Sequence, residues 1–162
     1  MPDYFIRGKF ALVERTSPVL TCISDPVSDL KMIDRLTKIL KDALRSNGGL
    51  GIALPQLGIS LRGFHLASSI TRPSKRRFCF NPEIVAKSSE ITTMTEGCLS
   101  LGGGKEYYKV PRPARISVTY INEHGAVTEE ILTGAAARCF QHEFDHLNGI
   151  LISDGNQKVV VK

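Results

Sequence analysis

The sequence is marked first by what it lacks. It has no tryptophan, no internal repeat and no apolar run that approaches the ~20 residues a membrane-spanning helix needs. The opening stretch MPDYFIRGKFALV carries an acidic residue and no long apolar core, unlike a secretory signal peptide. The four cysteines, which are widely spaced and form no CxxC pair, do not resemble a disulfide framework. We therefore expect a cytoplasmic protein in a reducing compartment.

The composition is that of an ordinary globular chain. Its 162 residues are 42% hydrophobic and 23% charged, which predicts one domain over residues 1–162. The net charge of +5 leans toward acidic partners. The densest basic stretch, RPSKRR at residues 72–77, reads as a hairpin tip, and a solvated turn is a simpler explanation for it than a nucleic-acid contact.

One helix is clear from its periodicity. Apolar residues recur at helical spacing through SDPVSDLKMIDRLTKILKDALRSNGG, a pattern typical of a core-facing helix. Ser24 or Asp25 can cap its start, Pro26 is tolerated in its first turn, and Gly48 or Gly49 ends it. The core stripe consists of Leu30, Ile33, Leu36, Leu40 and Leu44, widened by Met32, Ile39 and Ala43.

Short strands follow, and then a second helix. The predicted strands are RGFHLA, RRFCF, EIVAKS, ARISVTYIN and AVTEEILT, and NEHG joins the last two as a hairpin with His124 at its tip. The second helix begins near Thr133 and stops at Asn148-Gly149. This order predicts an α+β fold, in which antiparallel β-sheets pack around a central second helix, with the first helix as one further N-terminal element.

The stretch QHEFDHLNG (residues 141–149) places two histidines four positions apart on the second helix. Side chains at this spacing lie on one helix face, so His142 and His146 can bind one divalent ion. Glu143 lies on nearly the same face and can take a proton from water at that ion. An HExxH pattern also arises by chance, and a pair of histidines on a helix surface is the alternative.

The third ligand has to lie upstream of this motif. The pattern HExxHxxGxxH fails because Ile152 occupies the position of its third histidine. A downstream glutamate, as in thermolysin-like peptidases, fails because no Glu follows Glu143 and Asp154 is the only acidic residue beyond the motif.

Four upstream side chains are candidates: Cys98, Cys139, His65 and His124. Cys139 lies one turn before His142, but helix side chains lean toward the N-terminus, which directs a short cysteine away from the ion. Cys98 lies in TEGCLSLGGG, where glycines let the backbone approach a metal closely. Because thiolate is also a good ligand for zinc or ferrous iron, we favour Cys98 over the alternatives.

Three stretches together resemble the signature motifs of the peptide deformylases, in that family's order. They are GLGIALPQLG (residues 49–58), EGCLS (96–100) and QHEFDHLNG (141–149). Each is a weak or moderate signal alone, but all three in order are specific. The resemblance implies a metal-dependent hydrolase that removes the N-formyl group from formyl-methionine at the start of newly made polypeptides and releases formate.

The resemblance also implies roles for individual residues. One divalent ion, most often ferrous iron in the family, with zinc or nickel as substitutes, would be bound by Cys98, His142 and His146. Glu143 would act as general base and then as acid. Gln56 and the backbone N–H of Leu99 would stabilise the developing oxyanion. Residues expected near the substrate are Leu50, Gly51, Glu96, Gly97 and Cys139.

The chain departs from the family pattern in two places. The first motif usually reads Ala-Ala where this chain has Ala53-Leu54, which adds bulk beside the expected active-site loop. Only 16 residues follow His146, whereas many bacterial members continue into a C-terminal helix associated with ribosome docking. We expect a short, monomeric member from a bacterium, an organelle or a phage. Its transient ribosome contact would use residues 72–77 and the tail ending in Lys162.

Two other functions fit parts of the pattern. A metallopeptidase that cuts internal peptide bonds would share the HExxH motif but needs a further ligand downstream. A structural zinc module could use Cys98, Cys139, His142 and His146, but it would need neither Glu143 nor a glycine-rich loop, and a closed site leaves no position for water.

Metal-binding histidines usually donate from the second ring nitrogen to a carboxylate or carbonyl. Asp145 adjoins His146 but leaves the helix in another direction, so we expect it to pair with Arg112 in VPRP. Two solvated surface charges are the alternative.

Overall fold

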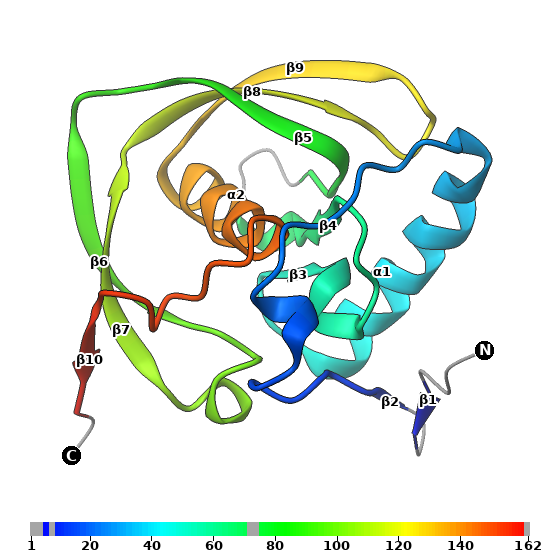
Figure 1. The fold of residues 1–162 in the computed structure, drawn as a ribbon. Helices are drawn as coiled ribbons and strands as arrows, with labels where there is room; N and C mark the ends of the chain where they lie inside the picture. Colours follow the sequence, from blue (N-terminus) through cyan, green and yellow to red (C-terminus); the bar gives the residue numbers. More distant parts are fainter. Residues whose placement is uncertain (1–4, 7–8, 71–74, 161–162) are drawn as a thin grey trace.

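The computed structural model describes residues 5–6, 9–70 and 75–160. It has the predicted α+β fold, and its largest sheet contains five antiparallel strands in the order β3-β4-β5-β8-β9 (Figure 1). Their bounds are β3 (Gly51–Ala53), β4 (Gly63–Leu66), β5 (Arg77–Lys87), β8 (Arg115–Ile121) and β9 (Val127–Thr133). The hairpin between β8 and β9 lies where NEHG predicts it, with the His124 backbone N–H bonded to Asn122 Oδ1.

A second antiparallel sheet, of three strands, has the order β10-β7-β6. Its strands are β6 (Ile91–Gly97), β7 (Tyr107–Pro113) and β10 (Gln157–Val159). The chain passes from β5 into β6 and from β7 into β8 at one corner, so the two sheets are continuous there (Figure 1). Two further strands, β1 (Phe5–Ile6) and β2 (Lys9–Phe10), pair with each other.

The two α-helices in the described part of the chain lie on opposite faces of β3 and β4 (Figure 1). Helix α2 (Gly134–Leu147) lies in the hollow between the sheets, and α1 (Ile33–Asn47) covers the outer face. Strand β4 is therefore buried on both sides: Phe64 packs toward α2, while His65 stacks on Phe78 in the layer beneath α1. Short 3-10 helices complete the chain, at Pro18–Leu20, Leu30–Met32, Leu54–Leu57, Ser68–Ile70 and Gly102–Gly104.

Helix α2 ends as the sequence predicts, and its last turn is fixed by a Schellman motif. The N–H of Ile150 donates to the carbonyl of Asp145, and the N–H of Gly149 donates to that of His146. Gly149 has the left-handed φ of +70° that this motif requires. The N-terminal segment packs against this helix end, where the N–H of Ser24 donates to the Leu147 carbonyl.

The predicted start of the first helix is wrong. The helix begins at Ile33 rather than after Pro26, and the cap lies on the preceding 3-10 turn, where Asp29 accepts from the Lys31 N–H. Leu30 and Met32 are consequently exposed, while the rest of the predicted core stripe is buried or half-buried. Asp25 instead forms a bridge with Leu61, which holds this stretch extended.

Two predicted strands form one. RRFCF and EIVAKS both belong to β5, because the Asn81-Pro82 pair between them forms an irregularity within the strand rather than a turn. Asn81 adopts a left-handed φ of +48°, and its side-chain amide bonds both the N–H and the carbonyl of Val27.

Strands β6 and β7 were not predicted from the sequence. The large apolar residues of β6, Ile91 and Met94, are three positions apart and show no alternation. Pro111 and Pro113 argue against a strand at β7 because proline cannot donate a hydrogen bond to a neighbouring strand. The structure accommodates both prolines because β10 pairs only with residues 107–109, so β7 has a single neighbouring strand beyond that point.

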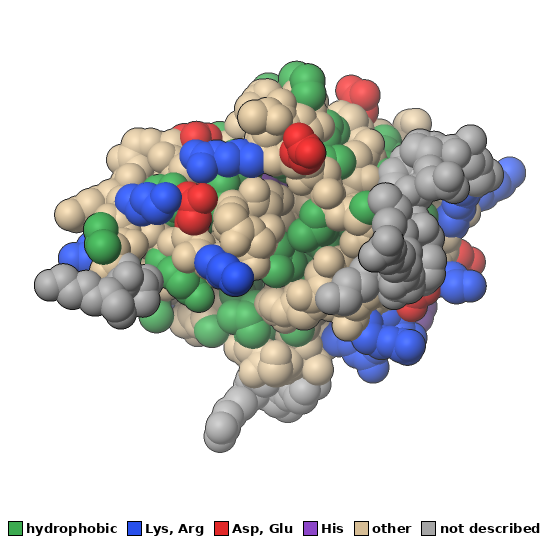
Figure 2. All heavy atoms as spheres, turned by 90° about the horizontal axis from the view of Figure 1, so that it is seen from below, with side chains coloured by type: hydrophobic (Ala, Val, Ile, Leu, Met, Phe, Trp, Pro, Cys, Tyr) green, Lys and Arg blue, Asp and Glu red, His purple; other side chains and the backbone are tan. Residues whose placement is uncertain are grey.

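The surface mixes charges of both signs. Figure 2 shows one face, where apolar side chains gather near the centre with basic and acidic side chains around them. Part of the basic stretch at 72–77 lies outside the described residues. Within the rest, Arg77 is buried with its Nε 2.6 Å from Glu130 Oε2, and Lys75 also pairs with Glu130. None of the described helices is long and apolar enough to cross a membrane.

The close contact between Gly149 and the backbone of Thr21 leads to a prediction about stability. A Cβ at position 149 would lie 2.6 Å from the Thr21 carbonyl carbon. A Cβ at Gly155, which has a similar φ of +73°, would have no neighbouring atom within 4 Å. Gly155→Ala should cost only the left-handed backbone, about 1–2 kcal/mol. Gly149→Ala should cost clearly more, because the N-terminal segment must also move. Urea unfolding of the metal-free protein measures both, and equal losses would contradict the packing described.

Candidate metal centre

Helix α2 and the turn after β6 bring three metal-binding side chains together. The rings of His142 and His146 lie one helical turn apart, with centroids separated by 5.2 Å. Cys98 follows β6 immediately, in a turn closed by the Leu101 N–H and the Cys98 carbonyl. Its Sγ lies 3.4 Å from His146 Nε2, and the ligand atoms of all three residues lie within 4.8 Å of one another.

These distances fit one divalent ion. Tetrahedral ligands at the usual 2.0–2.3 Å from zinc or a similar ion lie roughly 3.3–3.8 Å apart, so only small adjustments are needed. The set of one thiolate and two imidazoles suits such a metal. The upstream search thus ends at Cys98, as the sequence predicts.

The other candidate ligands lie elsewhere or are unsuited. His65 is buried in β4 with Nδ1 3.1 Å from the Arg77 carbonyl, and His124 is at the distant hairpin tip. Cys139 lines the neighbouring pocket and does not belong to the cluster whose ligand atoms lie within 4.8 Å of one another. The four-ligand structural zinc site is therefore not supported.

His142 is oriented by a buried carboxylate. Its Nδ1 lies 2.9 Å from Glu96 Oε2, so the ring donates there and leaves Nε2 free for the ion. Glu96 also accepts from Arg112 through two bonds, of 2.7 and 3.0 Å. Burial alone would raise the pKa of Glu96, but hydrogen bonds from His142 and Arg112 outweigh it and lower the pKa to about 2. The predicted pairing of Arg112 with Asp145 is confirmed, at 2.8 Å.

Glu143 lies beside the ligands without joining them. Its side chain is buried, and Oε2 has no hydrogen-bond partner among the residues that the structure describes. A Cβ on residue 51 would lie 2.5 Å from Glu143 Oε1, so the glycine there makes room for this carboxylate. Burial raises the pKa of Glu143 to about 7, which suits a group that both takes up and returns a proton.

Gln56 is held in one orientation beside Cys98. Its Oε1 accepts from the Ala53 N–H at 2.9 Å, and its Nε2 donates to Ser100 Oγ at 3.0 Å and lies 3.8 Å from Cys98 Sγ. The amide N–H group therefore points toward the ligands. The side chain of the neighbouring Leu54 packs into the core beneath α1 rather than into the site.

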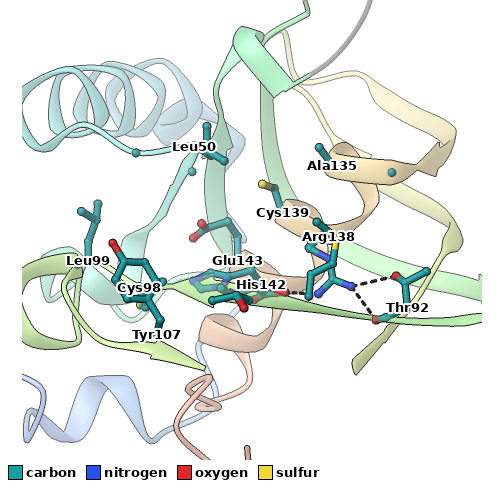
Figure 3. A pocket seen from close by; sticks show the side chains of 18 of the residues that line it. Leu50, Thr92, Cys98, Leu99, Tyr107, Ala135, Arg138, Cys139, His142 and Glu143 are labelled. Carbon is teal, nitrogen blue, oxygen red and sulfur yellow. Dashed lines mark hydrogen bonds and ion pairs between the residues drawn. The ribbon is translucent and has the colours of Figure 1, made fainter. Parts of the chain in front are cut away.

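A pocket of about 780 Å³ opens beside these residues (Figure 3). Its walls are largely apolar, as in sites for small ligands. Every residue predicted to lie near the substrate lines it, namely Leu50, Gly51, Glu96, Gly97 and Cys139. Gln56, Leu99, Cys98, His142 and Glu143 line it too.

Sequence reasoning missed Thr92, Tyr107 and Arg138, which also line the pocket. Arg138 lies four residues before His142, so helical spacing alone could have identified it. Thr92 lies four residues before Glu96 on β6, so both lie on one face of that strand, but the strand itself was not predicted and no signal in the sequence indicates Thr92.

Comparison with known proteins places the chain in one family. Residues 10–160 match the family model described as polypeptide deformylase. A peptide deformylase of Pseudothermotoga lettingae is 37% identical over 141 residues, covering 82% of this chain and 78% of the relative.

Solved structures agree. A peptide deformylase from Thermotoga maritima superposes with a TM-score of 0.81 at 36% identity, over 90% of this chain and 96% of that one. A Met-Ala-Ser-bound class I type b peptide deformylase from Acinetobacter baumannii has a TM-score of 0.82 at 31% identity, over 92% and 99%. With the cysteine and two histidines brought together beside a buried glutamate, and with similarity along nearly the whole chain, this protein belongs to the peptide deformylase family.

Proposed function

We propose that this chain, as a peptide deformylase, hydrolyses the formyl amide at the N-terminus of formyl-methionyl polypeptides and releases formate. The observation that carries the proposal is the cluster of Cys98, His142 and His146 beside the buried carboxylate of Glu143, at one end of an apolar pocket. An ion held there would polarise the formyl carbonyl and increase the acidity of water. Ferrous iron is the metal we propose, with zinc or nickel as substitutes in the same ligands.

Glu143 handles the protons in this proposal. Its carboxylate is buried, faces the backbone at Gly51 and has an oxygen free of competing bonds within the described structure. It can therefore accept the proton of the attacking water and pass it to the leaving amine. Because the departing amine is the methionine nitrogen, one group that acts as base and then as acid completes the hydrolysis.

Gln56 and Leu99 stabilise the charge that develops on the formyl oxygen. The bonds from Ala53 and to Ser100 hold the Gln56 amide in place before substrate arrives, so no reorganisation is needed during the reaction. The backbone N–H of Leu99, adjacent to Cys98, is the second donor in this proposal. The two donors would flank the carbonyl.

The pocket receives the methionine side chain and the start of the peptide. Leu50 and Cys139 supply apolar walls, while Gly51 and Gly97 let the peptide backbone approach. Glu96 lines the inner end of the pocket, where its carboxylate is already bonded to His142. The Acinetobacter baumannii structure was solved with Met-Ala-Ser bound, which supports a methionyl peptide as the ligand of this pocket.

Cys98→Ala should abolish stoichiometric metal, because it removes the only thiolate of the ligand set. Cys79→Ala is the matched control: Cys79 is also buried but lies in β5, within the apolar core and outside the ligand cluster. Metal content after gel filtration, measured by plasma emission, distinguishes the two. Retained metal in the Cys98 variant would show that another residue supplies the third ligand.

The activity itself is tested by formate release from formyl-Met-Ala-Ser, with anaerobically purified, iron-loaded protein. Acetyl-Met-Ala-Ser and an unformylated longer peptide should stay intact, and cleavage of the latter would support the endopeptidase alternative. Glu143→Gln should keep metal and fold but lose roughly 10²–10⁴-fold in turnover. Glu83→Gln, on the exposed part of β5, is the control and should keep full turnover.

We further propose a monomer in a cytoplasmic or equivalent reducing compartment, in line with four free cysteines, which touches the ribosome transiently. Because the Arg77 side chain is buried, whereas half of the Lys75 side chain is exposed beside the same Glu130 carboxylate, the contact would use Arg72, Lys75 and Arg76 and would weaken as salt screens it. Serine at these three positions should reduce co-sedimentation with ribosomes at low salt and leave tripeptide turnover intact. Unchanged co-sedimentation would refute the contact.

A further inference from the structure

Arg138 joins helix α2 to the three-stranded sheet at the inner end of the pocket. Its Nη2 donates to the carbonyl and hydroxyl of Thr92, at 2.7 and 3.0 Å, as the dashed lines in Figure 3 show. Its Nη1 donates to the Val110 carbonyl at 3.0 Å and to Glu96 Oε1 at 2.6 Å. One guanidinium thus bonds both β6 and β7, and it comes from the helix that carries two metal ligands.

Glu96 is the point where these bonds meet the ligand set. Its Oε1 accepts from Arg112 and Arg138, and its Oε2 accepts from Arg112 and His142. Four donors saturate an ionised carboxylate. The place of Oε2, and with it the direction in which the His142 ring points, therefore depends on how both arginines hold this group.

The two arginines act from opposite sides. Arg112 belongs to β7 and reaches toward the helix, where it also bonds Asp145. Arg138 belongs to the helix and reaches toward the sheet, where it bonds two backbone carbonyls. Gln141 of the helix bonds the β7 backbone at the Pro113 carbonyl. Among the described residues, however, only Arg138 connects the ligand-bearing helix directly to the backbone of both strands beside Glu96.

We infer that Arg138 is a positioning residue for the metal ligand His142 and that it acts through Glu96. Without its guanidinium, Glu96 keeps a single arginine and β6 can shift relative to α2, so the His142 ring loses its fixed orientation. Because Arg138 also lines the pocket, the residue that fixes the ligand is part of the wall that the substrate contacts. This inference rests on the metal centre of the proposed function.

The test is the affinity of each variant for Co²⁺, a spectroscopic substitute, measured by competition with a chelator and by the thiolate charge-transfer absorption. Arg138→Met, which keeps the length of the side chain and removes its donors, should bind Co²⁺ roughly 10–100-fold more weakly. Arg138→Lys keeps the charge without the forked geometry, so its Co²⁺ affinity should lie between those of the wild type and Arg138→Met. In a Glu96→Gln background, Arg138→Met should add little, because its effect passes through Glu96.

Arg62→Met is the matched control. Arg62 also ties α2 to the rest of the protein, through the Leu147 carbonyl and the Asn148 side chain, but at the end remote from Glu96. Its loss should leave Co²⁺ affinity and absorption unchanged. Wild-type affinity in Arg138→Met, an equal loss in Arg62→Met, or a full additional loss in the Glu96→Gln background would each overturn the inference.

The metal readout also separates this inference from the proposed function. If Arg138→Met weakens Co²⁺ binding as expected but the iron-loaded wild type releases no formate, the positioning role stands and the deformylation proposal fails. If the wild type releases formate and Arg138→Met binds Co²⁺ normally, the inference about Arg138 fails alone.

Discussion

The carboxylate of Glu96 accepts bonds from two arginines and a histidine in a region from which water is largely excluded. A buried charge is expensive unless it is paired and fully bonded, so this arrangement constrains everything around it. It requires β6 and β7 to lie against α2 in one register. It also determines which nitrogen of His142 is available to a metal. The geometry of the site is therefore inseparable from the electrostatic balance of the helix–sheet contact.

The apolar core supplies the rigidity on which this balance relies. Phe140 of α2 is fully buried and packs edge-on against Phe64 of β4, with ring centroids 5.0 Å apart. The same helix carries His142 and His146 on its other face, so each side of α2 has a distinct task. Since both sheets contact this helix, a movement of either one would displace the ligands relative to Cys98.

Much of the site could be predicted from the sequence, because spacing on a helix determines direction. The four-residue interval between His142 and His146 was enough to predict a shared ion, and the failure of every downstream scheme directed attention to Cys98. The partner of His142 was harder to predict. Nothing local to Glu96 indicates that it lies beside residue 142, because that contact depends on the pairing of β6 with β7, and prolines obscure the second strand.

The fold, too, could be predicted only in part. Periodicity identified the first helix, but it placed the start of that helix too early because Leu30 and Met32 continue the apolar spacing into an exposed turn. RRFCF and EIVAKS were predicted as two strands, whereas the side chain of Asn81 between them holds the distant residue Val27 and the strand continues through it. In both cases a contact remote in sequence outweighed a local signal.

The Schellman turn at Gly149 links two segments that are far apart along the chain. The N-terminal stretch at Thr21 packs directly on this turn, and Ser24 bonds the last carbonyl of α2. Local opening of the protein therefore cannot free the ligand His146 without also detaching the N-terminal stretch, and the two behave as one cooperative unit. A bound metal would therefore slow hydrogen exchange at the Ser24 amide as well as in the helix. The exchange rate at Ser24 would then report whether the metal site, more than a hundred residues later in the sequence, is occupied.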